Sequence, residues 1–171
     1  MKLILSDRAL NISIDNSSDT IQYIDLTQLN ISNCTGCFGC WTKTPGKCVI
    51  RDDAVKVYPY IAQSDTLLYI SRIKYGGYDT VMKTMLERSI PVQQPFIRLV
   101  NGETHHVQRD VALKKATIIA YGDIGSGERD VFKKLVARNA YNMNFDSYQV
   151  LFVREKELEQ TVRMEVSKWE K

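Results

Sequence analysis

Short apolar runs that alternate with amphipathic segments are the feature that most constrains the fold of this 171-residue chain. Nearly continuous apolar runs are typical of strands buried on both faces of a parallel sheet. The predicted strands are residues 2–5, 21–26, 66–70, 116–121 and 148–153. The predicted helices are residues 52–61, 78–88, 128–140 and 158–169. This alternation predicts a single α/β domain over residues 1–171 with a parallel sheet.

Five strands of this kind predict a three-layer, doubly wound sheet in the flavodoxin-like order 2-1-3-4-5. Ligands of such sheets bind beyond the carboxyl ends of the strands, where the strand order reverses. Two predicted loops follow strands and are therefore expected to line that crevice. They supply our candidate cofactor-binding residues, which are Ser71, Arg72, Ile73, Lys74, Tyr75, Gly76 and Gly77 in the first loop and Gly122, Asp123, Ser126 and Gly127 in the second.

Glycine and tyrosine in the first loop suit a planar ligand. Gly76 and Gly77 allow close approach of a ring, and Tyr75 offers a face for stacking. Arg72 and Lys74 would attract an anionic substrate or the pyrophosphate of a nicotinamide nucleotide. The simpler interpretation is a strand-to-helix turn with a surface tyrosine.

The second loop leads into a predicted helix whose N–H groups are an alternative anion site. Gly125, Ser126 and Gly127 would present these groups, whereas Glu128 would serve as a favourable charge at the helix start. His105 and His106 are adjacent, so their side chains diverge in an extended segment and make a poor chelate. We expect a surface or interface role for this pair.

The cysteines are clustered rather than scattered. They are Cys34, Cys37, Cys40 and Cys48. The N-terminus lacks the pattern of a signal peptide, so we expect a reducing, cytoplasmic location in which disulfides are disfavoured. Four thiolates from one compact loop can hold a [4Fe–4S] cluster or a structural zinc ion. Alternatively, the thiols pack as small hydrophobic groups beneath Phe38 and Trp41.

Residues 34–53, which begin Cys-Thr-Gly-Cys-Phe-Gly-Cys-Trp, resemble a segment of NAD(P)H-dependent FMN reductases and of the iron–sulfur flavoproteins related to them. The likeness continues through residues 77–79 to 108–109 and covers most of the chain from Ile24 onward. It implies a flavodoxin-like fold, FMN at the strand ends, and electron transfer from NAD(P)H to a small-molecule acceptor. It also implies a homo-oligomer, because members of this superfamily commonly form dimers or tetramers.

The chain departs from this family after its first predicted strand. The family's phosphate loop contains a Gly-Ser-Pro-Arg stretch, but here Asp7 places a carboxylate where an anion would bind. Residues 7–20 are too few for a full first helix, so we expect that helix to be reduced or missing, with a short hairpin around Asn16 and Ser17.

Two functional hypotheses follow from these features. The chain is an FMN-dependent NAD(P)H oxidoreductase that binds FMN through its other loops. Alternatively, it is a degenerate flavodoxin-like module that has lost FMN and acts as a partner subunit. The net charge of +3, without a basic block, argues against nucleic acid or a membrane surface as a partner. No run of eighteen apolar residues occurs, so we also expect no transmembrane helix.

Overall fold

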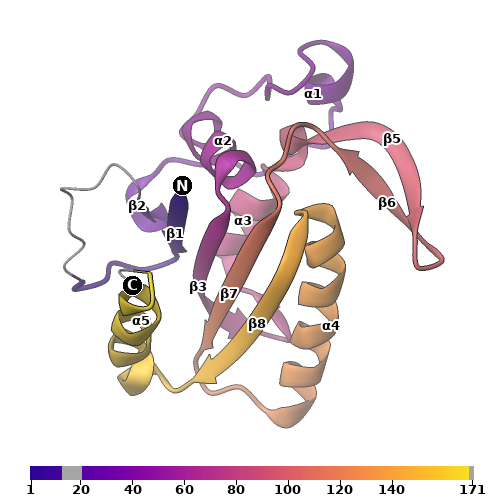
Figure 1. Ribbon diagram of the computed structural model, residues 1–171. Coiled ribbons are helices and arrows are strands. Elements are labelled where there is room, and N and C mark those ends of the chain that lie inside the picture. Colours follow the sequence, from indigo (N-terminus) through magenta and orange to yellow (C-terminus); the bar gives the residue numbers. More distant parts are fainter. Residues whose placement is uncertain (13–20, 170–171) are drawn as a thin grey trace.

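The computed structural model describes residues 1–12 and 21–169 (Figure 1). Within these residues, parallel strands pair in the order β2-β1-β3-β7-β8, which confirms the predicted order 2-1-3-4-5. Their bounds are β1 Lys2–Ser6, β2 Ile21–Asp25, β3 Thr66–Lys74, β7 Lys114–Tyr121 and β8 Phe145–Val153. The reversal of strand order therefore lies between β1 and β3.

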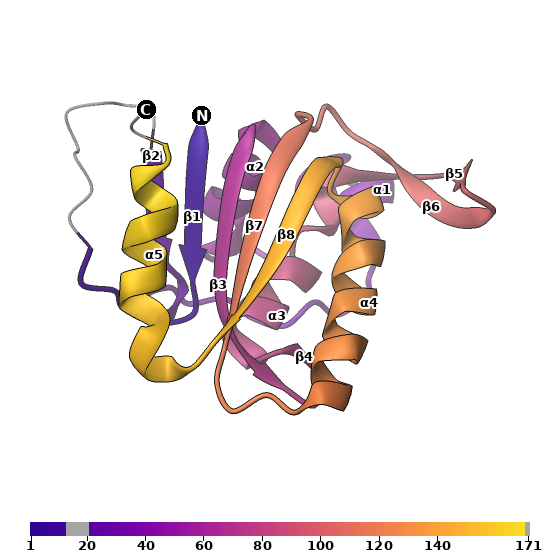
Figure 2. The same ribbon diagram turned by 60° about the horizontal axis from the view of Figure 1, so that its bottom comes forward.

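Helices cover both faces of the sheet (Figure 2). These are α2 Ala54–Gln63, α3 Thr80–Glu87, α4 Ser126–Asn142 and α5 Leu158–Ser167. The short helix α1, Gly39–Thr42, lies apart from the sheet in the cysteine segment (Figure 1). Short 3-10 turns are η1 Leu26–Gln28, η2 Ile90–Val92 and η3 Glu155–Glu157. The larger core lies between the sheet and α2, α3 and α4, and a smaller core lies beneath α5.

Alternating strand residues build the two cores. In β1, Leu3 and Leu5 belong to the larger core and Ile4 to the smaller one. The same alternation occurs in β3, where Leu67 faces one layer and Leu68 the other. Because both faces need apolar side chains, the strands are apolar runs rather than alternating patterns.

Among the described residues, no helix lies between β1 and β2, and α5 is the helix that packs on the smaller core. Residues 7–12 form neither helix nor strand, and the hairpin that we expected at Asn16 and Ser17 lies outside the described residues. Beside α5 the sheet carries polar side chains. Gln149 of β8 donates a hydrogen bond to Thr117 of β7 at 3.0 Å. Because this part of the face is polar, it does not require a covering helix.

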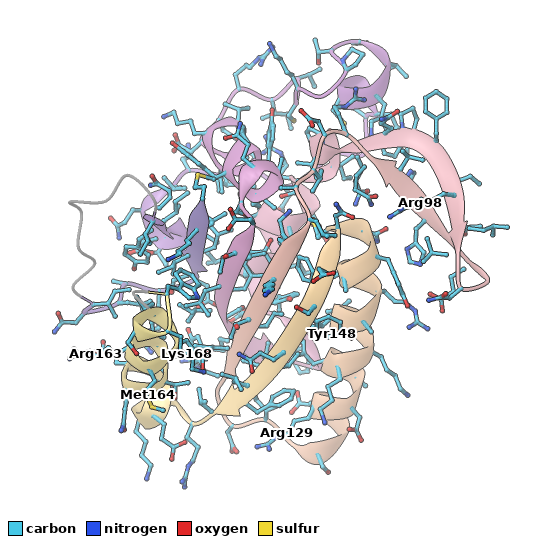
Figure 3. All side chains as sticks on the ribbon, viewed as in Figure 1. Arg98, Arg129, Tyr148, Arg163, Met164 and Lys168 are labelled. Atoms are coloured by element: carbon cyan, nitrogen blue, oxygen red, sulfur yellow. The ribbon has the colours of Figure 1, made fainter. Side chains whose placement is uncertain are left out.

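Figure 3 places Tyr148 on β8 and Lys168 just beyond α5. Both line a shallow hollow on the polar part of the sheet. Among the described residues, no helix is long and apolar enough to span a bilayer.

The first predicted loop is a hairpin, which corrects the expectation for residues 71–77. β3 continues through Lys74, and β4 (Gly77–Tyr78) pairs with it in the antiparallel sense. The extension is stable because Ile73 packs in the larger core beside its neighbours. Tyr75 and Gly76 form the turn, with φ of 53° and 73°.

A second hairpin lies between α3 and β7, where the sequence predicts neither strand nor helix. β5 (Gln93–Val100) and β6 (Glu103–Gln108) pair with each other and project away from the parallel sheet (Figures 1 and 2). Arg98 lies on this projection (Figure 3). Asn101 and Gly102, with φ of 52° and 83°, form its turn, and Asn-Gly is a strong sequence signal for such a turn.

Only part of the apolar surface of α4 is buried. Phe132, Val136 and Ala140 face the core. Val131 and Leu135 are exposed. The reason is that α4 packs on the sheet along a narrow stripe, so its flank faces the β3–β4 turn instead.

Candidate functional site

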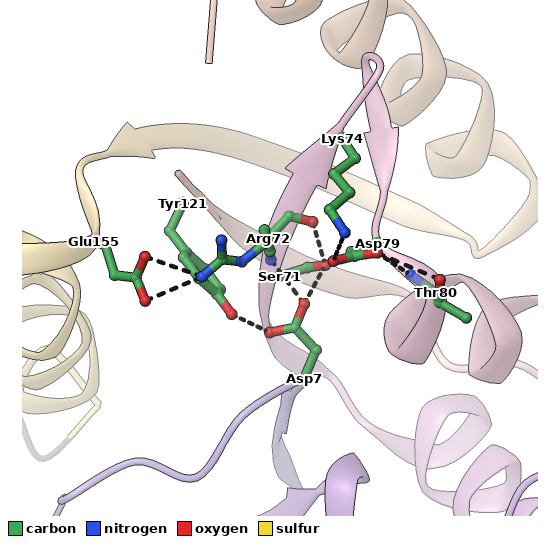
Figure 4. A network of polar contacts seen from close by, with 8 residues as sticks. All are labelled: Asp7, Ser71, Arg72, Lys74, Asp79, Thr80, Tyr121 and Glu155. Carbon is green, nitrogen blue, oxygen red and sulfur yellow. Dashed lines mark hydrogen bonds and ion pairs between the residues drawn. The ribbon is translucent and has the colours of Figure 1, made fainter. Parts of the chain in front are cut away.

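The carboxyl ends of β1, β3 and β7 meet at a buried carboxylate (Figure 4). Asp7, directly after β1, accepts hydrogen bonds from the Ser71 hydroxyl at 2.9 Å and from the Arg72 N–H at 2.7 Å. It accepts a third from the Tyr121 hydroxyl at 2.8 Å. These contacts join three strands at the position where the strand order reverses. A single carboxylate thereby satisfies three converging donors.

Two guanidinium groups flank this cluster. Arg8 and Arg72 lie over the ring of Tyr121, with 5.7 and 5.4 Å between each guanidinium carbon and the ring centroid. Both also form ion pairs with Glu155, at 2.8 and 3.0 Å. One carboxylate therefore balances one of these two positive charges, and both guanidinium groups also lie over an aromatic ring.

Further charges at this edge are paired as well. Lys74 forms a 3.2 Å ion pair with Asp79, and Asp79 accepts a hydrogen bond from the Thr80 N–H at 2.7 Å (Figure 4). Burial raises the pKa of Asp7, while its hydrogen bonds oppose that rise and the charge of Asp79 adds to it. Burial of Tyr121, with the neighbouring Asp7, raises the pKa of that phenol to about 12. Tyr121 therefore keeps its proton at neutral pH and donates a hydrogen bond to Asp7.

The predicted residues of the first loop separate into different environments. Ser71 and Arg72 join the Asp7 cluster, whereas Ile73 is buried in the core. Tyr75 is 93% exposed, so its ring is free for stacking. The turn at Gly76 and Gly77, with α4 and β5, borders a cavity of about 430 Å³.

The predicted residues of the second loop lie close to the first. Gly122 has φ of 126°, and a Cβ at this position would lie 3.9 Å from Cγ of Arg72. Asp123, Ser126 and Gly127 are exposed. The Gly125 N–H at the start of α4 donates to the Glu128 carboxylate at 3.2 Å. The helix thus supplies its own anion, as the alternative interpretation of Glu128 anticipates.

The four cysteines lie around one small cavity, which is also lined by Arg88 and residues of η2. Backbone turns of positive φ allow this wrapping, at Gly36 (65°), Phe38 (53°) and Gly46 (81°). A hydrogen bond from the Gly39 N–H, assisted by Thr35, lowers the pKa of the Cys37 thiol. Burial and the neighbouring thiols raise the pKa of Cys40.

Arg88, just after α3, closes the base of the cysteine segment. Its guanidinium donates to the Ser32 carbonyl at 2.7 Å and to the Asp52 carboxylate at 2.6 and 2.8 Å. It also contacts the Cys48 sulfur at 3.4 Å. Its buried Nε has no hydrogen-bond partner among the residues that the structure describes. The segment is therefore held at both ends by one cation that retains a free donor.

The cysteine segment contacts the projecting hairpin through aromatic rings. Trp41 stacks on Phe38, lies 4.9 Å from the ring of His106, and donates to the Gln93 carbonyl at 3.0 Å. His105 instead bonds Asn142 of α4 at 3.1 Å. The two histidines diverge as predicted, but His105 is buried rather than at the surface.

Sequence reasoning missed three residues of these clusters. Tyr121 reads as the last apolar residue of a strand, and Glu155 and Arg88 read as ordinary helix-end charges. Contacts between residues so far apart in the chain leave no local pattern in a single sequence. Among the described residues, no group of three or more histidine, cysteine, aspartate or glutamate side chains is arranged as a site for a single metal ion.

Sequence relatives place the chain near iron–sulfur flavoproteins. The iron–sulfur flavoprotein of Archaeoglobus fulgidus is 32% identical over 85 residues, which are 50% of this chain and 37% of that protein. An iron–sulfur flavoprotein of Methanocaldococcus jannaschii is 29% identical over 93 residues, or 54% of this chain and 47% of that protein. The matches thus span less than half the length of these curated relatives. No protein-family model matches the chain.

Solved structures share the fold over almost the whole chain. Azoreductase AzrA superposes with a TM-score of 0.60 at 10% identity and covers 97% of this chain and 93% of its own. An FMN-dependent NADH-azoreductase from Bacillus anthracis, in complex with FMN, has a TM-score of 0.54 at 14% identity and covers 98% and 97%. These relatives and this fold confirm the resemblance to flavodoxin-like reductases and iron–sulfur flavoproteins.

The two cofactors that this resemblance implies fit the chain differently. Flavodoxin-like sheets bind FMN at the β1/β3 switch point, but there Asp7 already takes the donors that a phosphate would need. The FMN phosphate therefore does not fit this position. A [4Fe–4S] cluster fits the donor chemistry of the cysteine cavity, which all four cysteines and Arg88 line.

Proposed function

We propose that this relative of the iron–sulfur flavoproteins is a flavin-linked oxidoreductase whose electron carrier is a [4Fe–4S] cluster on the cysteine segment. The observation that carries the proposal is the gathering of all four cysteines around one cavity beside a buried arginine. Such a cluster would supply one-electron storage and transfer. Its electrons would pass between a flavin reduced by NAD(P)H and a small-molecule acceptor.

The surrounding residues would hold and shield that group. Cys34, Cys37, Cys40 and Cys48 would be its ligands. Arg88 would donate a hydrogen bond from Nε and offset the negative charge of the thiolates. Phe38, stacked on Trp41, would limit access of water from one side.

Anaerobic purification tests the proposal directly. We expect brown protein with about four iron atoms and four acid-labile sulfides per chain. Cys48→Ser should lose the colour, whereas Lys47→Gln, an exposed change in the same segment, should keep it. Colourless protein with one zinc ion, or with free thiols and no metal, would contradict the proposal.

A second candidate function is an FMN- or flavin-dependent NAD(P)H reductase that holds the flavin by its ring. The cavity of about 430 Å³ beside Tyr75 supports this candidate, because its size is typical of small-molecule sites. It is lined by apolar side chains of α4, including Leu135. The fold shared with the FMN-bound azoreductase is consistent with it.

Quenching of flavin fluorescence tests this second candidate. We expect riboflavin to bind at micromolar concentration and NADH or NADPH oxidation to depend on it. Leu135→Asp should weaken binding at least tenfold, because it places a charge in the cavity. Leu113→Asp, which changes an exposed leucine that does not line the cavity, is the matched control. Equal binding by both variants would contradict this candidate.

A further inference from the structure

The Asp7 cluster has the arrangement of an anion site that already contains its anion. Three donors converge on one carboxylate, and they come from the ends of two strands, β3 and β7. The Ser71 hydroxyl and the Tyr121 hydroxyl are side-chain donors, and the Arg72 N–H is a backbone donor. Hydroxyl and backbone N–H donors of this kind also bind phosphates in proteins.

The charges around the cluster oppose a second anion. Asp79 lies close enough to Asp7 to raise its pKa, so a phosphate here would face two carboxylates. The nearest guanidinium groups, Arg8 and Arg72, are both paired with Glu155. Arg8, Arg72 and Lys74 thus face the three carboxylates of Glu155, Asp79 and Asp7. Asp7 therefore completes the charge balance of this edge and also takes its three converging donors.

We propose that Asp7 is a specificity-determining residue that occupies the phosphate position of the fold and excludes phosphorylated ligands from it. A ligand at this edge would bind by its ring and not by a phosphate, so FMN would gain nothing over riboflavin. The proposal concerns the cluster itself and does not depend on the cysteine segment. The comparison of riboflavin with FMN rests on the proposed flavin-linked function, whereas the measurement of phosphate binding does not depend on that function.

Equilibrium dialysis with radiolabelled inorganic phosphate tests the cluster without any flavin. Wild-type protein should bind no phosphate up to millimolar concentration. Asp7→Ser removes the carboxylate and leaves three donors and a space, so it should gain saturable binding of one phosphate per chain. Asp7→Asn is the control, because it removes the charge but fills the same volume, and it should gain none.

A second substitution tests whether the proposed donors hold the phosphate. Tyr121→Phe removes one donor to this position. The double variant with Asp7→Ser and Tyr121→Phe should bind phosphate about tenfold more weakly than Asp7→Ser alone, since a hydrogen bond to a charged group contributes about this factor. Circular dichroism confirms that each variant is folded.

Titration of riboflavin and FMN into wild-type protein gives a test that needs no variant. We expect dissociation constants within about threefold of each other. FMN binding at least tenfold tighter than riboflavin, or phosphate binding by the wild-type protein, would overturn the proposal. Equal phosphate binding by Asp7→Ser and Asp7→Asn would overturn it too. If neither flavin binds, the second candidate function fails, and phosphate binding by the wild-type protein and Asp7→Ser alone decides the role of Asp7.

Discussion

Arg88 donates two hydrogen bonds to the carboxylate of Asp52, at 2.6 and 2.8 Å, from a position where its own side chain is 1% exposed. Burial alone would raise the pKa of Asp52. The hydrogen bonds from Arg88, and from the Ser32 and Ala54 N–H groups, instead lower it to about 2. The pair joins the residues on both sides of the cysteine segment to the end of α3.

This pair predicts acid sensitivity with a defined sign. Asp52 has a folded pKa of about 2 against an ordinary value of 3.8, so its ionised form stabilises the fold. That stabilisation is fully present above about pH 4 and is lost as the pH falls toward 2. Urea unfolding across this range should show the loss, and it should be smaller in Asp52→Asn. An equal acid response of both proteins would contradict this assignment.

Removal of the carboxylate should also be costly at neutral pH. Asp52→Asn leaves the buried Arg88 without its counter-charge, and we expect a loss of about 3 kcal/mol in the free energy of unfolding. Glu87→Gln is the matched control, because it breaks an exposed i,i+4 pair with Lys83 and should cost about 0.5 kcal/mol or less. Urea titration at pH 7 measures both.

The sequence predicts the parallel sheet well because the signal is local. Each apolar run identifies one strand, and the alternation with helices sets the order. Contacts across the fold lack such a signal. Tyr121 donates to Asp7 over a separation of 114 residues, and no property of either residue alone indicates its partner. The β5–β6 hairpin did have a local signal in Asn101-Gly102, although its two strands lack the long apolar runs of the parallel sheet.

The candidate site likewise combines features that are local in the sequence with contacts that only the fold creates. The clustering of cysteines along the chain already predicts that the four thiols lie close together, because the segment is short and rich in glycine. The structure places them around one cavity. The carboxylate at residue 7 predicts a poor phosphate site. How that carboxylate is stabilised depends on three strand ends, which only the folded structure brings together.

Lys114 predicts that the stability of the fold rises with pH in the alkaline range. Burial lowers its pKa to about 8 from 10.5, so the folded protein disfavours its charged form. The resulting penalty is fully present below about pH 8 and is relieved as the pH rises to 10.5, which makes the wild-type protein more stable there. The difference corresponds to about 3 kcal/mol at most.

A substitution isolates this effect. Lys114→Met should raise the stability at neutral pH and abolish the gain between pH 8 and 10.5. Lys115→Met changes the adjacent exposed lysine and should do neither. Thermal unfolding at pH 7, 8, 9 and 10 measures the three proteins. A wild-type curve that falls over this range by more than that of Lys114→Met would refute the assignment.

Replacement of glycine by alanine should lower the free energy of unfolding by different amounts in two turns of the same kind. Gly76 of the β3–β4 turn and Gly102 of the β5–β6 turn have φ of 73° and 83°, each after a residue of positive φ. A Cβ at Gly76 would lie 2.7 Å from Cγ1 of Val131 in α4, whereas a Cβ at Gly102 would meet nothing within 4 Å. Alanine should therefore cost about 1 kcal/mol at Gly102, from backbone strain alone.

At Gly76 the added methyl group would be strained in the same way and would also overpack against Val131. We expect a total loss of about 3 kcal/mol in the free energy of unfolding. Val131→Ala in the Gly76→Ala background should restore only part of the loss that is due to the contact, because it removes Cγ1 but leaves the Val131 Cβ at 2.8 Å from the added Cβ. Urea unfolding of the two single variants and of the double variant separates the terms. Equal losses for Gly76→Ala and Gly102→Ala would mean that α4 moves aside without cost, and the β3–β4 turn would then not be fixed by its packing against Val131.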